Sequence, residues 1–574
     1  MKKYLLLLLL FACCWSLFAQ FGLQLHYDSL SPEVEKIILN TKLKKKYKSL
    51  IAIEKDLQKL TDRFHREHYT AFSVDTLIND ASIYKAYLYI GNPLTIQHIE
   101  VEGLQEVFKE EIKKTSSPFS MQDVFAYASD VLTFLENKGY PFAKVECKDI
   151  IPDSNRNKAL IQVEENNYIA WDSIIVKGNA KLSKSFLYGF FNIKFGKAYE
   201  ESTAKQIPDL IQELPYVEET QPASISFGKD KAALYLYLNK RNTNQFDGFL
   251  GIVPVNDKSG KTLITGNINL LLNNIMTLGE RISLQWKNPD KLSQNLAIEL
   301  TFPYLFRSRF GLDLDFYLQK KDTTYLHINF SPALQYYFKG SNYLAFYYRY
   351  NNARLIATRH LQYAVSLPDQ IDFDLHLYGL EFFYRKVDYV FNPRKGFILS
   401  ATAAIGKRTI IENTHIPSEL YDSMNMQSMQ VEGNADASLY VPIRKRWTCL
   451  LRLQGAYVYN SELFENELFR IGGLKTLRGF IEQSIYASAY AILNTELRFI
   501  FHKNSFVHAF FDAGWYEKKS TGGYVNDIPF GFGLGLAFDT KAGVFSLSYA
   551  LGKQFDNPIS FKTGVVSFGY IALF

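Results

Sequence analysis

The chain has 574 residues, which is too long for one ordinary domain and predicts several. Its 64 Lys and Arg residues against 58 Asp and Glu residues give a formal charge of only +6, without a basic block, so the composition argues against a nucleic-acid partner. The 38 Tyr and 45 Phe residues suit strands that face lipid on one side and water on the other.

Residues 1–19 predict a secretory signal peptide, with two lysines, a run of leucines and a cut after Ala19. A lipoprotein signal is the alternative, because Leu10-Phe11-Ala12-Cys13 loosely resembles a lipid-attachment site, although the leader would then be unusually short. No other stretch approaches about 18 uninterrupted apolar residues, so no transmembrane helix is expected. Cleavage at Ala19 leaves Cys147 and Cys449 without metal-ligand spacing, and we interpret both as unpaired structural thiols.

The N-terminal part after the signal contains a weak internal repeat. Its clearest copy predicts the order strand, helix, helix, strand, strand, with an alternating strand at 96–103 and an amphipathic helix at 121–138. The opening strand recurs before Gly178, which stands 75 residues after Gly103. An earlier copy is degenerate, and only its second half is visible. The repeat predicts three small α+β domains, at 20–92, 93–166 and 167–242.

From about Gln245 onward the helical period disappears, and alternating runs separated by turn residues predict strands. Sixteen can be marked, with centres near 250, 269, 284, 298, 315, 331, 347, 379, 401, 435, 453, 495, 511, 534, 548 and 569. Strands of about 10 residues fit an all-β transmembrane barrel of about 16 antiparallel strands over 243–574. A soluble β-sandwich is the alternative, because the alternation is imperfect, but the export signal and the even strand number favour the barrel.

The last predicted strand, at 564–574, places aromatic residues on one face. Phe568, Tyr570 and the terminal Phe574 alternate along it, together with Val566 and Ala572. This pattern resembles the C-terminal outer-membrane targeting signal that barrel-assembly machinery recognises.

A catalytic site is not predicted. The ten His residues are scattered without a paired ligand cluster, and neither a nucleophile elbow nor a phosphate-binding glycine loop occurs. The glycine-rich run at 531–535 alternates as a strand, so we interpret it as close packing inside a barrel. We therefore expect a protein that is not an enzyme and uses no metal or other cofactor.

The longest connection, at about 461–487, holds the most informative motif: Leu477, Arg478, Gly479 and Phe480. Carboxylates follow on each of the next two predicted strands, at Glu496 and Asp512. An arginine inside a barrel requires partners for its donors, and carboxylates are the best of them. An ordinary external loop with incidental charges is the alternative interpretation.

This order of motifs resembles the BamA/TamA superfamily of outer-membrane insertases and translocators, and the repeated units resemble the POTRA (polypeptide-transport-associated) domains of that superfamily. The run at 136–146 is the most specific local match to a POTRA domain. The resemblance implies an inner loop whose Arg478 pairs with Glu496 and Asp512, with Gly479 allowing a tight tip and Phe480 packing beneath it. The three units make the layout closest to TamA.

The resemblance further implies an outer-membrane location in a Gram-negative bacterium, with the POTRA domains in the periplasm. Unfolded outer-membrane or secreted proteins would be the partners, received at the POTRA domains and inserted or translocated at the barrel seam, in contact with the lipid bilayer. Periplasmic or inner-membrane accessory subunits are compatible with such a role. Two alternatives stay open: a two-partner secretion transporter for one dedicated substrate, and a passive outer-membrane pore.

Overall fold

The computed structural model describes residues 21–27, 31–44, 46–80, 83–94, 96–112, 119–153, 156–254, 262–288, 293–540 and 543–573. The predicted signal peptide and Phe574 lie outside these ranges. The contacts of the chain define two compact units, of which the first holds the first two N-terminal modules and the second holds the barrel with most of the third module. Within the described ranges, none of the helices has both the length and the apolar character that crossing a bilayer requires.

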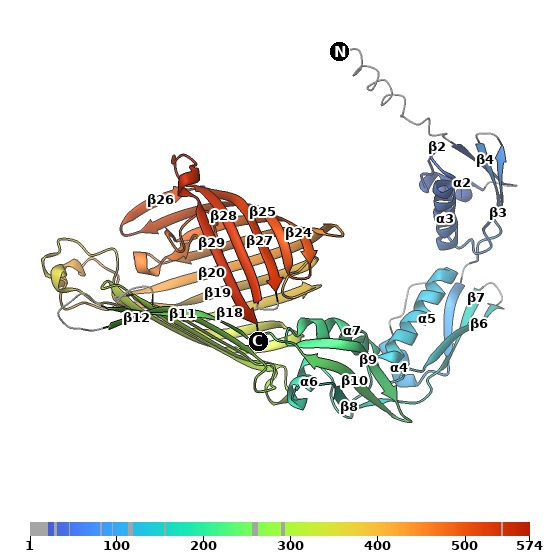
Figure 1. Ribbon diagram of the computed structural model, residues 1–574. Coiled ribbons are helices and arrows are strands. Elements are labelled where there is room, and N and C mark those ends of the chain that lie inside the picture. The colour runs from blue at the N-terminus through green and yellow to red at the C-terminus, as the bar shows by residue number, and fades with distance from the viewer. Residues whose placement is uncertain are drawn as a thin grey trace, which may run out of the picture. The chain divides into compact units, whose positions relative to one another are not determined.

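The first module is a four-stranded sheet with two helices on one face (Figure 1). Its elements are β1 (Phe21–His26), α2 (Pro32–Asn40), β2 (Lys46–Tyr47), α3 (Leu50–Arg66), β3 (Ser73–Asp80) and β4 (Ile83–Tyr89). The strands lie in the order β2-β1-β4-β3, with β1 parallel to β4. Ile53, Leu60 and Phe64 repeat at helical spacing along α3 and are fully buried against the sheet. This module has a complete core, although its sequence repeat is degenerate.

The second module has the predicted order of elements. These are β5 (Ile96–Glu102), α4 (Glu106–Glu111), α5 (Met121–Glu136), β6 (Lys144–Asp153) and β7 (Arg156–Glu164), with sheet order β5-β7-β6. Ser120 caps the start of α5, and its side chain and that of Asp123 form a capping box. Val124, Val131 and Leu135 form its fully buried face.

The third module repeats this arrangement. It consists of β8 (Ala170–Lys177), α6 (Lys184–Phe190), α7 (Glu201–Glu213), β9 (Val217–Phe227) and β10 (Lys231–Lys240), with sheet order β8-β10-β9. In α7, Ile207, Leu210 and Ile211 recur at helical spacing and are buried.

A closed antiparallel barrel follows. Its strands are β11 (Gln245–Pro254), β12 (Thr262–Asn273), β13 (Arg281–Asn288), β14 (Gln294–Phe302), β15 (Phe310–Lys321), β16 (Tyr325–Lys339), β17 (Asn342–Leu355), β18 (Phe373–Val387), β19 (Gly396–Ile410), β20 (Gln427–Arg444), β21 (Trp447–Tyr459), β24 (Ala489–His502), β25 (Ser505–Ser520), β27 (Phe530–Thr540), β28 (Gly543–Lys553) and β29 (Val565–Leu573). Strand β26 (Gly523–Asp527) extends the β25 hairpin beyond the wall. Each of the sixteen predicted centres lies in one of these strands, so the predicted fold class is confirmed.

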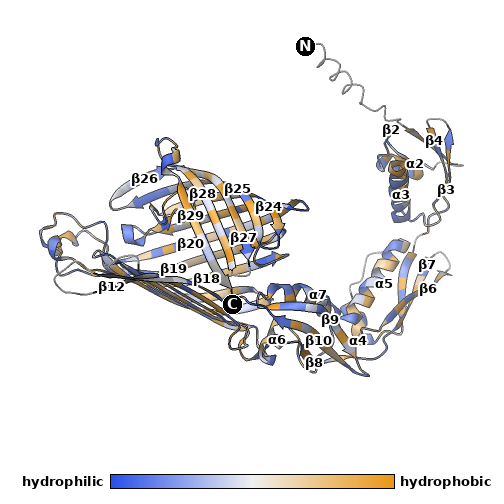
Figure 2. Ribbon diagram, viewed as in Figure 1, coloured by the Kyte–Doolittle hydropathy of each residue, from blue (hydrophilic) through white to orange (hydrophobic). Residues whose placement is uncertain are grey.

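Apolar residues recur along β24, β25, β27 and β28 (Figure 2), and exposed apolar side chains occur on each of these strands, among them Leu497, Val507, Leu534 and Leu547. On β27, for example, Leu534 is 67% exposed and Phe532 and Phe538 are also exposed, whereas glycines alternate with them on the inner face. This alternation is the one that a strand between lipid and a lumen requires.

Candidate functional site

The connection from β21 to β24 folds into the barrel as a loop with a compact tip. Two three-residue strands, β22 (Phe469–Ile471) and β23 (Ile485–Ala487), pair at its base. At the tip, Thr476 Oγ1 accepts from the Gly472 amide at 2.8 Å, and the Gly473 amide donates to the Leu477 carbonyl at 3.1 Å. Leu477 is fully buried in the cluster that also includes Ile471 and Ile485. We call residues 472–480 the inner loop.

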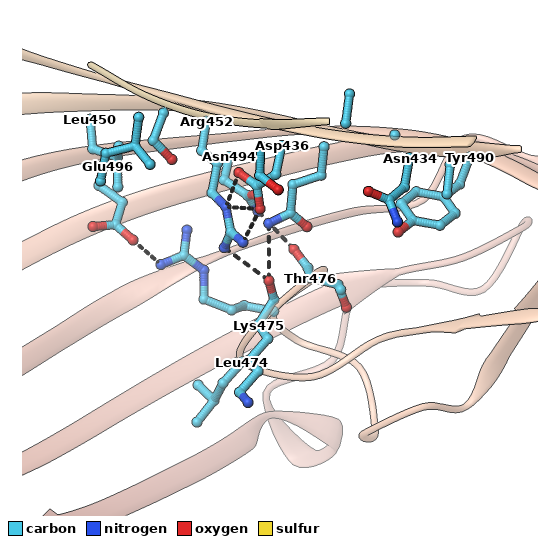
Figure 3. Close-up of a pocket in the computed structure, with 18 of the residues that line it drawn as sticks. Asn434, Asp436, Leu450, Arg452, Leu474, Lys475, Thr476, Tyr490, Asn494 and Glu496 are labelled. Atoms are coloured by element: carbon cyan, nitrogen blue, oxygen red, sulfur yellow. Dashed lines mark hydrogen bonds and ion pairs between the residues drawn. The ribbon is translucent and has the colours of Figure 1, made fainter. Parts of the chain in front are cut away.

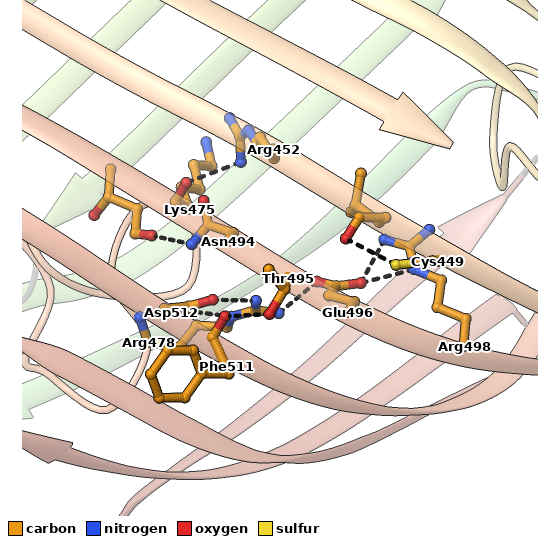
Figure 4. Close-up of polar contacts among 12 residues, drawn as sticks. Cys449, Arg452, Lys475, Arg478, Asn494, Thr495, Glu496, Arg498, Phe511 and Asp512 are labelled. Atoms are coloured by element: carbon orange, nitrogen blue, oxygen red, sulfur yellow. Dashed lines mark hydrogen bonds and ion pairs between the residues drawn. The ribbon is translucent and has the colours of Figure 1, made fainter. Parts of the chain in front are cut away.

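The Arg478 side chain is held by two carboxylates from two strands (Figure 4). Its Nε and Nη2 donate to the Asp512 oxygens at 2.7 and 2.5 Å, and its Nη1 donates to Glu496 Oε1 at 2.5 Å. The Arg478 amide also donates to Asp512, at 3.1 Å. Arg478 is 8% exposed and Asp512 is fully buried, so the contact is nearly dry. A bidentate, charge-assisted pair of this kind fixes orientation as well as position.

Neighbouring groups complete the charge balance around Arg478. Arg498 Nε donates to Glu496 Oε2 at 2.7 Å, so this carboxylate lies between two guanidinium groups. The Arg478 guanidinium carbon also lies 3.9 Å from the centroid of the Phe510 ring, a cation–π contact. The two-residue period of the strands places Glu496 and Arg498 on the inner face of β24 and Phe510 and Asp512 on the inner face of β25.

Two glycines allow the tip to approach the wall. Gly479 has φ +92°, and a Cβ there would lie 2.7 Å from the Leu551 carbonyl group of β28. Gly531 on β27 lies against the tip, because a Cβ on it would be 1.9 Å from the carbonyl oxygen of Arg478. Gly531, the first glycine of the run in β27, therefore leaves the inner loop the space that it occupies.

Three wall residues that the sequence analysis did not single out hold the loop backbone (Figure 3). Arg452 Nη1 and Gln454 Nε2 donate to the Lys475 carbonyl at 3.0 and 3.2 Å, and Asn494 Nδ2 donates to the Thr476 carbonyl at 2.8 Å. Arg452 is itself oriented by Asp436 on β20. In the sequence, these polar residues alternate with apolar ones along their strands, which indicates that they face the lumen. The alternation does not indicate which loop atom each of them contacts.

The inner loop thus contacts five consecutive wall strands. Arg452 belongs to β21, Glu496 to β24, Asp512 to β25 and Gly531 to β27, and Gly479 touches β28. A cavity of about 690 Å³, lined by both polar and apolar side chains, remains beside these contacts, between the loop and the wall. These contacts reach β28, the strand next to β29.

The remaining predicted site residues take no part in the hydrogen bonds around Arg478 that are described above. Phe480 is partly buried and packs on the cluster around Leu477. Phe568 and Tyr570 lie on the outer face of β29, where Phe568 is 70% exposed and the Tyr570 ring is 4.6 Å from Phe545. Phe574 lies outside the described residues.

The barrel closes through a short seam. Strands β11 and β29 share only two residue pairs, Gln245 with Leu573 and Phe246 with Ala572. Ten pairs join β11 to β12, and seven join β28 to β29. Within the described residues, 247–254 of β11 have no partner on β29. Beyond these two pairs, the described backbone groups on the facing edges of β11 and β29 therefore have no ladder partner across the seam.

A model of the Omp85 superfamily domain matches residues 274–569, which is more than half of the chain. The chain belongs to the Omp85 superfamily. The match runs from before β13 to Gly569 within β29 and includes the inner loop, and it confirms the family resemblance seen in the sequence. As a member of this superfamily, the protein is an outer-membrane β-barrel.

Two solved structures of CdiB share the fold of this chain over nearly its whole length. CdiB from Acinetobacter baumannii is 14% identical, with a TM-score of 0.54 over 95% of this chain and 100% of that one. CdiB from Escherichia coli is 16% identical, also with a TM-score of 0.54 and the same coverage. BamA from Haemophilus ducreyi lacking POTRA domains 1–3 is 17% identical, with a TM-score of 0.42 over 84% of this chain and all of that one. A comparison with curated proteins finds no match. The layout closest to TamA stays a prediction.

Proposed function

We propose that this protein receives unfolded outer-membrane or secreted proteins at its N-terminal modules and inserts or translocates them at the seam between β11 and β29, without catalysing a chemical reaction. The observation that carries the proposal is the two-pair seam. Unpaired backbone amides and carbonyls are costly in lipid. An incoming strand that pairs with β11 or β29 therefore lowers the free energy of the barrel edge and of the incoming strand itself.

The inner loop supports this role mechanically. Its contacts fix the wall from β21 to β28, so that separation of β29 from β11 does not disturb the rest of the barrel. In this proposal Arg478 is a positioning residue, and Glu496 and Asp512 hold it.

The N-terminal modules supply open sheet edges in the periplasm, in this proposal. Strand β3 ends the first sheet, β6 ends the second and β9 ends the third, whereas the starts of β5 and β8 already pair with Phe119 and Ala198. An unfolded client adds to such an edge through main-chain hydrogen bonds, which do not depend on its sequence. Folding of the client provides the driving force, so neither a nucleotide nor a metal is required, and accessory subunits would act at these modules.

The test is to lock the seam with a disulfide. Phe246→Cys and Ala572→Cys stand opposite each other across the seam, in a chain whose Cys147 and Cys449 are replaced by Ser. We expect the oxidised variant to stop assembling client barrels in proteoliposomes and to recover after reduction.

The matched control is Ser548→Cys with Ser567→Cys, an opposed pair one strand away that joins β28 to β29. It should leave assembly unchanged. Full activity of the locked seam would refute insertion at this position. Quantitative proteomics of the outer membrane after depletion then separates a general insertase, which affects many barrels, from a transporter for one dedicated substrate. A large steady conductance with unchanged barrels would instead favour a passive pore.

A further inference from the structure

A cleft of about 550 Å³ lies between the third module and a turn of the barrel, and basic residues gather in its lining. Lys184 lies at the start of α6, Lys194 follows α6, and Arg307 belongs to the turn between β14 and β15. All three side chains are exposed. Asp172 is the single carboxylate in the lining, so the cleft has a net positive charge.

Two phenylalanine side chains next to these cations are largely exposed to solvent. Phe195 lines the cleft and is 71% exposed, and Phe306, the neighbour of Arg307, is 92% exposed. Exposure of large apolar side chains to water is unfavourable, and contact with lipid would remove that cost. Basic residues beside exposed aromatic residues are the combination that binds the interface of an anionic bilayer.

The turn that carries Phe306 and Arg307 is held in a disfavoured backbone conformation. Tyr304, Phe306 and Arg307 have φ values of +54°, +54° and +60°, a region that residues with a side chain seldom adopt. Tyr304 is buried and stacks on Tyr337 with ring centroids 4.7 Å apart. Ser185 Oγ of the third module accepts from the Arg307 amide at 2.9 Å. These contacts fix the backbone of the turn, so that the side chains of Phe306 and Arg307 point outward.

The turn also lies at the ends of two wall strands. It directly follows β14 and precedes β15, two strands of the barrel wall. Phe310 at the start of β15 and Tyr336 on β16 are outward-facing and exposed, with ring centroids 5.4 Å apart. Aromatic residues at the ends of transmembrane strands lie at the level of the lipid headgroups. Phe306, only four residues before Phe310, is therefore within reach of the same layer.

We propose that this cleft binds the headgroup of an anionic phospholipid, with Lys184, Lys194 and Arg307 contacting the phosphate and Phe195 and Phe306 entering the interface. The site ties the third module to the membrane surface beside β14 and β15. It depends on the membrane-spanning barrel but not on the insertion of clients, so either proposal can fail while the other stands.

The experiment measures lipid retention by the full chain in detergent micelles with native mass spectrometry, using dioctanoyl phosphatidylglycerol as the probe. The double variant Lys184→Gln with Lys194→Gln should weaken retention about thirty-fold at low salt. The matched double variant Lys148→Gln with Lys229→Gln removes the same charge from exposed positions outside the cleft and should stay within about twofold of the parent. Equal retention by the two double variants would overturn the proposal.

Further arms identify the ligand. Dioctanoyl phosphatidylcholine should bind much more weakly than phosphatidylglycerol, and inorganic phosphate at the same concentration should not displace the lipid. Displacement by phosphate would mean a general anion site and would overturn the lipid assignment. A nitroxide attached after Phe306→Cys, in the chain without Cys147 and Cys449, should be more accessible to oxygen than to a water-soluble nickel complex. The reverse order would exclude contact with the bilayer.

Discussion

At the scale of residues, the inner loop depends on charges that are nearly removed from water. Arg478 is 8% exposed, Asp512 is fully buried, and the two are joined by a pair of parallel hydrogen bonds. The attraction between such ions is weakly screened, and the loss of one partner leaves the other buried and uncompensated. Glu496 differs from Asp512 because Arg498 also neutralises it. Asp512 should therefore be the more sensitive of the two carboxylates to the loss of Arg478.

Replacement of this arginine should destabilise the barrel and impair its activity without blocking export. We expect Arg478→Ala to lower the free energy of unfolding by about 3–5 kcal/mol, because Asp512 then lacks a counter-charge. Urea unfolding in micelles and complementation of a depleted strain measure the two effects. Arg281→Ala removes a looser ion pair with Glu299, whose side chains are 57% and 45% exposed, and it should cost about 1 kcal/mol or less.

The three charged residues should also behave as one network. Asp512→Asn and Glu496→Gln should each add little to the defect of Arg478→Ala, with coupling free energies of about 1–3 kcal/mol in double-mutant cycles. Strict additivity of the unfolding free energies would argue against a shared site.

A methyl group on Gly531 should displace the inner loop. The Cβ would lie 1.9 Å from the Arg478 carbonyl oxygen, and a backbone atom cannot move aside without shifting the tip. Gly433→Ala on β20 is the matched control, because the nearest atom to its Cβ would be the Thr402 carbonyl oxygen at 3.6 Å. We expect Gly531→Ala to open the inner loop to protease and Gly433→Ala to leave cleavage unchanged. Equal cleavage of the two variants would contradict the close approach.

At the scale of elements, α7 is fixed to the barrel through its last residue. Glu213 Oε2 accepts from the amide and the hydroxyl of Ser341, at 2.8 and 2.7 Å, in the turn between β16 and β17. The Tyr304 hydroxyl donates to the Gly340 carbonyl in the same turn. The carboxylate therefore joins the third module to a periplasmic turn of the barrel in the proposed orientation.

Loss of this carboxylate should loosen the third module. Hydrogen bonds to a charged group contribute about 1.5–3 kcal/mol, so Glu213→Ala should raise amide hydrogen exchange in α7 and in the β16–β17 turn by roughly tenfold or more. Glu218→Ala, at an exposed position on β9, serves as the control. Unchanged exchange in both variants would show that other contacts suffice to hold the module.

Some of these elements can be predicted from the sequence and others cannot, for physical reasons. The two-residue period marks all sixteen wall strands because each one lies between lipid and lumen. The three-residue strands β22 and β23 are too short to establish a period, and β2 has only two residues. Glu496 and Asp512 could be proposed as partners of Arg478 from the motif, and the structure brings the three together. The contacts of Arg452 and Asn494 with the loop carbonyls depend on how the loop folds back into the barrel. The periodicity of the strands gives no information about that fold.

At the scale of the whole molecule, the chain combines three modules with a barrel that has its own internal support. The first module keeps a separate core of buried residues, as does the second, whereas the inner loop and the wall belong to the barrel. Stability and client handling should therefore be separable, because neither core is completed by side chains from the barrel.

Deletion of residues 20–90 tests this separation. The barrel should keep its heat-modifiable mobility on gels and its unfolding midpoint, since the contacts of Arg478 and the seam lie entirely within the second compact unit. Client assembly in proteoliposomes should fall, because the deletion removes the β3 edge and with it one place where an unfolded strand can add. Asp512→Asn in the full-length chain provides the opposite case, a weakened barrel with all three modules intact. A barrel that fails to fold after the deletion would contradict the independence of the first module, and undiminished assembly would show that clients enter by another edge.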